Sequence, residues 1–174
     1  MRLVTFTRAG RVQQEVGALA DDGSVLDLAA AEPVLRGQTM LSLAAAETGL
    51  IAKLRAALPH APKVADARLM APIPRTPKNI FCVGKNYHEH AKEFAGSGFD
   101  GGAKDVVPPY PVVFTKPHTA IIATGEKILG EMDPTGGLDF EGELAVVIGH
   151  GGRGITKANA LNHVFGYTIV NDVT

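Results

Sequence analysis

The sequence lacks the features that mark several large classes of protein. It has 17 basic and 18 acidic residues, a formal net charge of −1, and no cluster of basic residues. Nucleic acid and anionic membrane surfaces are therefore not expected as partners, because both are bound through an excess of Lys and Arg. No apolar run approaches the roughly 20 residues that cross a bilayer, and the N-terminus lacks the apolar core of a signal peptide.

Cysteine is nearly absent. Cys82 is the single cysteine, so an intramolecular disulfide is excluded, and the composition fits the reducing cytoplasm as the predicted location. Cys82 lies in a strand-like run, where a cysteine usually acts as a small buried hydrophobe. We therefore interpret it as a packing residue and not as a catalytic thiol.

Proline is concentrated at one place, which divides the chain. Three prolines fall within residues 72–77 and disfavour helix and sheet alike. We predict a small N-terminal domain over residues 1–71, a stiff proline-rich linker over 72–78, and a second domain over 79–174. The first domain shows no cluster of titratable groups in the sequence, so packing and assembly are its expected roles.

Local patterns predict the elements of both domains. A turn over residues 21–24 should join two strands, and the Ala/Leu-rich segment 41–58 should form a helix that Pro59 stops. A Gly-rich loop over residues 95–103 is a candidate lid over a site. In the second domain we expect strands near residues 80–84, 111–114, 120–123 and 166–172, and helices over 88–94 and 156–164 with Thr156 as N-cap.

One acidic segment carries the strongest chemical signal. Asp139, Glu141 and Glu143 alternate along the chain, and an apolar run over residues 144–149 follows them. A strand has a period of two residues, so the three carboxylates should share one face. The apolar run predicts a strand that is buried on both sides. Buried like charges repel one another, so a divalent cation is the simplest group that would stabilise them.

Asp172 ends another strand-like segment and supplies a further carboxylate. Glu141, Glu143 and Asp172 together form an all-oxygen set, which suits Mg²⁺, Mn²⁺ or Ca²⁺ better than Zn²⁺ or Cu²⁺. Asp139 has the same parity but lies farther out, and we expect it to support the site or to lie on the surface. The alternative is a solvated strand on which the acids form salt bridges.

A histidine and a glutamate three residues apart form a second candidate. On a helix, His90 and Glu93 would be neighbours, and the carboxylate would orient and charge the imidazole as a general-base pair requires. An exposed contact without function is the alternative. A competing interpretation takes His88, His90 and Glu93 as ligands of non-haem iron, which would need both histidines on one strand face.

Four motifs occur in order along the second part of the chain. They are Gly84-x-Asn86-Tyr87-x-x-His90-x-x-Glu93, then Pro111 to Pro117, then Asp139-x-Glu141-x-Glu143 with the run to Gly149, and then Gly166 to Thr174. Together they resemble the fumarylacetoacetate hydrolase family. The resemblance implies an α+β fold, a mixed β-sandwich roll with a small N-terminal α/β domain, and usually a homodimer.

The resemblance also implies a site and a chemistry. It implies Mg²⁺ or Mn²⁺, and Ca²⁺ in some members, on Glu141, Glu143 and Asp172, with His90 and Glu93 as the catalytic dyad. The substrates it implies are small dicarbonyl acids, typically 2,4-dioxo acids, and we predict a hydrolase that cleaves a C–C bond in them. Isomerisation or decarboxylation of 2-oxo or 2-hydroxy-dienoic acids are the alternatives. Lys116 and Tyr87 are the candidate substrate-binding residues.

The chain departs from the family pattern after Asp172. Family members continue with Ala-Arg-Asp, a Gln-containing helix and a lysine that helps to bind substrate. The sequence ends at Thr174. We therefore expect a family member that is truncated at its C-terminus, and a catalytically silent binding module is a further alternative.

Overall fold

The computed structural model describes residues 1–89, 91–92 and 108–174. Contacts divide the chain into two units, one made of Met1–Pro74 with Ile122–Thr174 and the other of Arg75–Ile121. Residues 70–79, which include the proline-rich segment, contain no helix or strand. The domain boundaries drawn from the sequence remain predictions.

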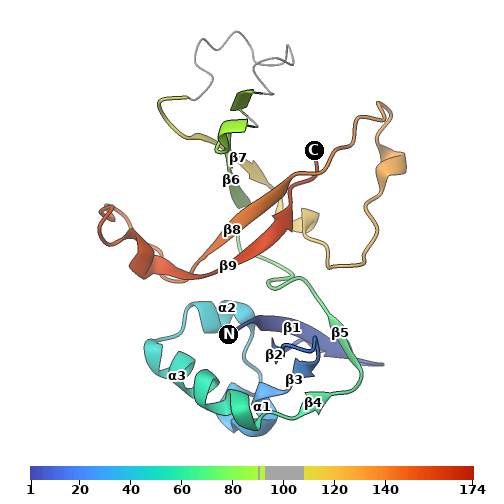
Figure 1. Ribbon diagram of the computed structural model, residues 1–174, viewed down its shortest axis with the longest axis vertical. Helices are drawn as coiled ribbons and strands as arrows, with labels where there is room; N and C mark the ends of the chain where they lie inside the picture. Colours follow the sequence, from blue (N-terminus) through green and yellow to red (C-terminus); the bar gives the residue numbers. More distant parts are fainter. Residues whose placement is uncertain (90, 93–107) are drawn as a thin grey trace. The chain divides into compact units, whose positions relative to one another are not determined.

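The first 74 residues contain a five-stranded sheet (Figure 1) in the order β4-β3-β2-β1-β5. Every pair in it is antiparallel. The predicted turn is confirmed: Gly23 has a φ of +82°, and the Ala20 N–H donates to the Ser24 carbonyl at 2.9 Å. The strands are β1 (Leu3–Arg8), β2 (Glu15–Leu19), β3 (Val25–Leu26), β4 (Lys63–Val64) and β5 (Ala67–Leu69).

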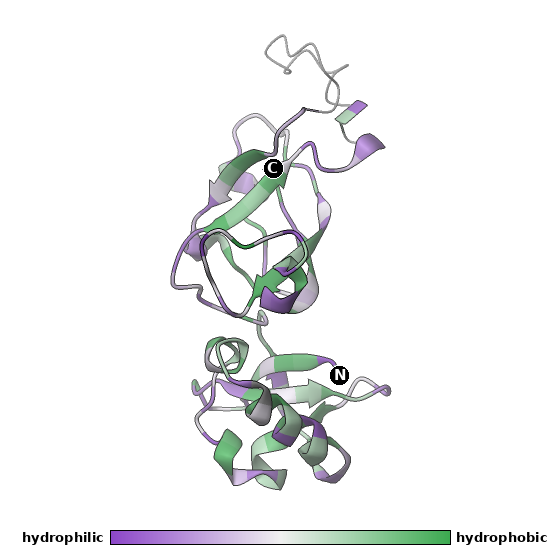
Figure 2. Cartoon of the chain, turned by 90° about the vertical axis from the view of Figure 1, so that its left-hand side faces the viewer, coloured by the Kyte–Doolittle hydropathy of each residue, from purple (hydrophilic) through white to green (hydrophobic). Residues whose placement is uncertain are grey.

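Helices accompany this sheet and enclose an apolar core. Leu28, Leu43 and Leu54 are fully buried and come from three different helices, and they pack with residues of β2 such as Val16. Figure 2 shows apolar residues on both the helices and the strands of this part. The helices are α1 (Leu28–Ala31), η1 (Pro33–Leu35), α2 (Met40–Ala44), α3 (Thr48–Ala57) and η2 (Leu58–His60).

The single helix predicted over residues 41–58 is wrong, because the segment forms two helices. Thr39 and Ser42 form a capping box that starts α2, and the Ala45 N–H closes it by donating to the Leu41 and Leu43 carbonyls. Glu47 then takes an extended conformation, with φ −66° and ψ 159°, before α3 begins. The predicted stop is confirmed, since α3 ends at Ala57, before Pro59.

The middle unit contains a two-stranded antiparallel sheet, β6 (Ile80–Gly84) with β7 (Val112–Lys116). Cys82 is buried in β6, as predicted. The strand predicted over residues 120–123 is wrong. Its backbone groups are used in local turns: the Ala120 N–H donates to the Pro117 carbonyl at 3.0 Å, closing the short helix η3 (His118–Ala120). The Ala123 N–H bonds the Glu126 carboxylate at 2.8 Å.

The acidic segment leads into a second two-stranded antiparallel sheet, β8 (Gly142–Ile148) with β9 (Val164–Asn171). Short 3₁₀ turns η4 (Gly130–Met132) and η5 (Ala160–His163) flank it. The helix predicted over residues 156–164 is wrong, and Thr156 caps no α-helix. The Asn159 N–H donates to the Thr156 carbonyl at 3.0 Å, a three-residue spacing that makes turns and 3₁₀ helix instead.

The predicted burial of β8 on both sides is also wrong. Leu144, Val146 and Ile148 are 55%, 48% and 56% exposed. Their cross-strand neighbours Ile169 and Tyr167 are exposed as well. The sheet has two strands in the described part of the chain, which is too few to enclose an apolar face. The residues of the opposite face, which include Glu143, are half-buried.

The fold is therefore a mixture of helices and antiparallel sheets, in agreement with the α+β class. The sandwich roll and the separate N-terminal α/β domain remain predictions. In the N-terminal part the helices accompany an antiparallel sheet and do not alternate with parallel strands. No helix in the described ranges is both long and apolar enough to cross a membrane.

Two glycines test how tightly the N-terminal core is packed. A Cβ added at Gly17 in β2 would lie 2.6 Å from the Leu26 carbonyl oxygen and 2.9 Å from the Phe6 ring. We expect Gly17→Ala to lower the free energy of unfolding by about 1–3 kcal/mol, measured by urea unfolding monitored by circular dichroism. Gly49 in α3 has open space, so Gly49→Ala should raise it by up to about 1 kcal/mol. Equal free energies of unfolding for the Gly17→Ala and Gly49→Ala variants would contradict this packing.

Candidate functional site

The β8–β9 pairing continues past the ends of both strands, into the acidic segment. The Asp172 N–H donates to the Glu141 carbonyl at 2.8 Å. Asp139 and Thr174 then exchange two backbone hydrogen bonds, at 2.7 and 3.2 Å. Glu141 therefore lies opposite Asp172, two positions beyond the pair of Glu143 and Val170.

This register decides which residues share a face. Residues opposite each other in an antiparallel ladder point to the same side, and so do residues two apart on one strand. Glu141, Glu143 and Asp172 thus lie on one face at the open end of the β8–β9 ladder. Asp139 has the same parity, so the shared face predicted from the sequence agrees with the register. The role of the three residues as metal ligands remains a prediction.

Two details separate the three candidate ligands from Asp139. Glu141, Glu143 and Asp172 are half-buried, whereas Asp139 is exposed. The Asp139 carboxylate accepts a hydrogen bond from the neighbouring Phe140 N–H at 2.7 Å. The Asn171 side-chain oxygen accepts the Glu141 N–H at 2.9 Å, which fixes the backbone between the two strand ends. The Asp139 carboxylate is therefore engaged by the adjacent backbone N–H.

The donor set fits a hard divalent cation, because carboxylate oxygens are the ligands that Mg²⁺ and Mn²⁺ prefer. The backbone register brings the three residues to one end of the ladder. Their side chains are not gathered around a point: in the part of the chain that the structure describes, no three His, Cys, Asp or Glu side chains are grouped to hold a metal ion. A bound cation would have to draw these carboxylates together.

The predicted dyad follows β6. Lys85 leaves the strand with a φ of +54°, a left-handed conformation that is uncommon for a residue with a side chain. Tyr87 lies two residues farther along the chain, and its carbonyl accepts the Ala91 N–H at 2.9 Å. This begins the helical turn that the sequence predicts. His90, Glu93 and the Gly-rich loop lie outside the described residues, so their predicted roles are untested.

The strand that the iron alternative requires is not present at His88. This alternative needs His88 and His90 on one face of a strand, and residues 88–89 and 91–92 are helical. His88 therefore lies on no strand, and His90 lies outside the described residues.

The two candidate substrate-binding residues lie toward opposite ends of the β6–β7 ladder, Lys116 within it and Tyr87 beyond it. Lys116 pairs with Ile80, whereas Tyr87 follows Gly84, which pairs with Val112. Four residue steps along a strand separate these ends, about 13 Å. The ladder itself does not bring Tyr87 and Lys116 together, and their roles in binding substrate remain predictions.

The expectation that the N-terminal part lacks clustered titratable groups is wrong. Arg8 donates to both Glu15 oxygens, at 2.9 and 3.2 Å, and to Asp27 at 2.6 Å. These hydrogen bonds raise the pKa of Arg8 above its usual range, and the bond to Glu15 contributes most. Asp27 also caps α1 by accepting the Ala30 N–H at 2.9 Å. The sequence signal was Asp27 directly before a helix, but its pairing with Arg8 depends on the sheet.

Comparison with known proteins decides the family. A family model described as "Fumarylacetoacetate (FAA) hydrolase C-terminal" matches residues 79–174, more than half of the chain. The chain belongs to the fumarylacetoacetate hydrolase family. The matched range holds all seven candidate site residues of this family member.

Three relatives show the range of chemistry. The oxaloacetate tautomerase YisK of Bacillus subtilis (strain 168) is 47% identical over 97 residues, which cover 56% of this chain and 30% of the tautomerase. A fumarylacetoacetate hydrolase from the psychrophile Exiguobacterium antarcticum has a TM-score of 0.71 and 34% identity, covering 100% of this chain and 56% of that chain. A 5-carboxymethyl-2-hydroxymuconate delta-isomerase from Mycobacterium smegmatis has a TM-score of 0.59 and 29% identity, covering 100% and 55%.

The chain thus spans little more than half the length of these two solved proteins. It includes the segments that carry the candidate ligands and the predicted dyad. The activity of a whole protein of this family therefore comes to this chain as a proposal.

The Arg8 network can be tested through its two carboxylates. We expect Asp27→Ala to lower the free energy of unfolding by about 2 kcal/mol, because it removes both a helix cap and an Arg8 partner. Asp27→Asn keeps a cap and should lose about half as much. Asp21 is fully exposed where it pairs with Arg2, so Asp21→Ala should show no measurable change by urea unfolding. Equal losses at positions 21 and 27 would show that burial does not strengthen the network.

Proposed function

We propose that this chain carries the metal site of an enzyme that cleaves a C–C bond in 2,4-dioxo acids by hydrolysis. The observation that supports it is the β8–β9 register, which places Glu141, Glu143 and Asp172 on one face in a member of this family. Acylpyruvates are the simplest substrates of this class. They carry a carboxylate, an adjacent keto group and a second carbonyl.

Glu141, Glu143 and Asp172 would hold Mg²⁺ or Mn²⁺, with Ca²⁺ as a further candidate. When bound, such an ion supplies a Lewis acid that stabilises negative charge on the oxygens of a 2-oxo acid. Three protein carboxylates leave positions for water and for a substrate with two adjacent oxygens. The half-burial of all three strengthens their attraction for a cation compared with fully solvated acids.

The remaining roles belong to residues of the β6–β7 unit. His90 takes a proton from a water directed at the distal carbonyl, and Glu93 stabilises the imidazolium that forms. Lys116 offers a positive charge to the acid substrate, and the Tyr87 hydroxyl offers a hydrogen bond. The cleaved bond lies between the attacked carbonyl carbon and the carbon next to the 2-oxo group.

A second candidate reaction is the tautomerisation of a 2-oxo dicarboxylic acid. The 47% identity to an oxaloacetate tautomerase favours it. Hydrolysis and tautomerisation both place negative charge on the 2-oxo oxygen, so one metal site serves either. They differ in outcome, since hydrolysis yields two products and tautomerisation only moves a proton. The family resemblance adds the expectation of a homodimer, and the single cysteine adds that of a cytoplasmic location.

Activity separates these reactions. Purified protein with Mg²⁺ or Mn²⁺ is assayed on acetylpyruvate for release of pyruvate, and on the enol form of oxaloacetate for conversion to the keto form. We expect pyruvate release that falls by at least about 100-fold in Glu141→Ala, because a metal ligand is lost. Turnover that Glu141→Ala leaves untouched would contradict the metal assignment. Turnover of the oxaloacetate enol alone would establish the second candidate.

Metal binding can be measured without activity. We expect Mn²⁺, followed by the loss of its free-ion electron paramagnetic resonance signal, to bind at least about tenfold more weakly to Glu143→Gln than to the unchanged chain. Asp139→Asn is the matched control and should leave the affinity unchanged, because its carboxylate is exposed and accepts the adjacent Phe140 N–H. Equal weakening by both changes would indicate general surface charge instead of a site.

A further inference from the structure

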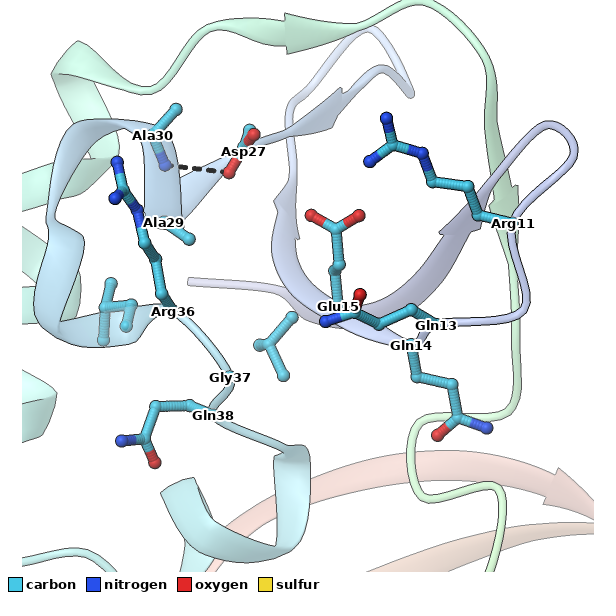
Figure 3. Close-up of a pocket in the computed structure, with 12 residues that line it drawn as sticks. Arg11, Gln13, Gln14, Glu15, Asp27, Ala29, Ala30, Arg36, Gly37 and Gln38 are labelled. Carbon is cyan, nitrogen blue, oxygen red and sulfur yellow. Dashed lines mark hydrogen bonds between the residues drawn. The ribbon is translucent and has the colours of Figure 1, made fainter.

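A pocket of about 370 Å³ lies within the N-terminal part, between the loop before β2 and the segment after η1. Arg11, Gln13 and Glu15 line one side, and Arg36 and Gln38 line the other (Figure 3). Its volume lies in the range that holds a small organic ligand. No residue proposed for the metal site or the dyad belongs to it.

The carboxylates in the pocket are already occupied. Both Glu15 oxygens accept from Arg8, and the two Asp27 oxygens accept from Arg8 and from the Ala30 N–H. Every carboxylate oxygen in the pocket thus already accepts a hydrogen bond, and the pocket is a poor site for a cation. Arg8 offsets one of the two negative charges on these acids.

The two arginines of the pocket differ from these carboxylates in their hydrogen bonding. The Arg11 and Arg36 side chains make no ion pair or hydrogen bond within the described ranges, and both residues are exposed. Figure 3 shows them on opposite sides of Glu15 and Asp27. Two unpaired guanidinium groups make the pocket net positive, and each has the planar geometry that binds a carboxylate through two hydrogen bonds.

We propose that this pocket binds a small organic dianion, a dicarboxylate with one acid group toward Arg11 and the other toward Arg36. The two arginines lie on opposite sides of Glu15 and Asp27 (Figure 3), which favours a ligand with charge at both ends over a compact anion. The side-chain amides of Gln13 and Gln38 can donate to or accept from a hydroxyl or keto group between those ends. The site is distinct from the proposed metal site and does not depend on the proposed function.

Succinate serves as the probe, and isothermal titration calorimetry on the whole 174-residue chain measures its binding. We expect Arg11→Gln and Arg36→Gln each to weaken binding by about tenfold, the loss of one charge-assisted contact. Arg55→Gln is the matched control, since Arg55 is exposed on α3 and lies outside the pocket, and it should change nothing. Circular dichroism confirms that each variant is folded.

Three outcomes overturn the proposal. The first is no succinate binding at millimolar concentration. The second is binding that all three variants weaken equally, which would show attraction to surface charge in general. The third is binding of inorganic phosphate as tight as that of succinate, which would show that one compact anion suffices. The proposal is supported if succinate binds more tightly than phosphate, and if both pocket variants weaken succinate binding while the control variant does not.

Discussion

The antiparallel register of β8 and β9 is the constraint on which the candidate metal site depends. It sets Glu141 opposite Asp172 and leaves Glu143 two positions inward on the same face. A shift of one residue on one strand would turn its side chains to the other face and separate the acids. The Asn171 side chain holds the Glu141 N–H just where regular pairing ends, so the register is fixed at the point where the ligands lie.

The sequence predicted this arrangement for a physical reason. A period of two is a local property of any strand, so the shared face of Glu141 and Glu143 could be read without knowing what pairs with them. The turn at residues 21–24 and the end of α3 before Pro59 were likewise predictable, because each depends on nearby residues. The partner of a strand is not a local property. Asp172 was added as a carboxylate at the end of another predicted strand, and the family resemblance then implied the same three ligands.

The predictions that failed are mostly those that depend on residues distant in the sequence. The apolar run after Glu143 indicates what β8 would bury if other elements covered it, but burial depends on chain that packs from elsewhere. Residues 41–58 form two helices because Glu47 turns extended. The Arg8 network and its pocket were missed because Arg8, Glu15 and Asp27 meet only when β1 and β2 pair and α1 follows β3.

The central claim is that Glu141, Glu143 and Asp172 hold one divalent cation. The most direct measurement is a crystal structure of the protein with Mn²⁺, using anomalous scattering to locate the ion. The account predicts a single strong peak bonded to carboxylate oxygens of all three residues at the open end of the β8–β9 ladder. A peak at another place, with these three carboxylates apart and solvated, would contradict it.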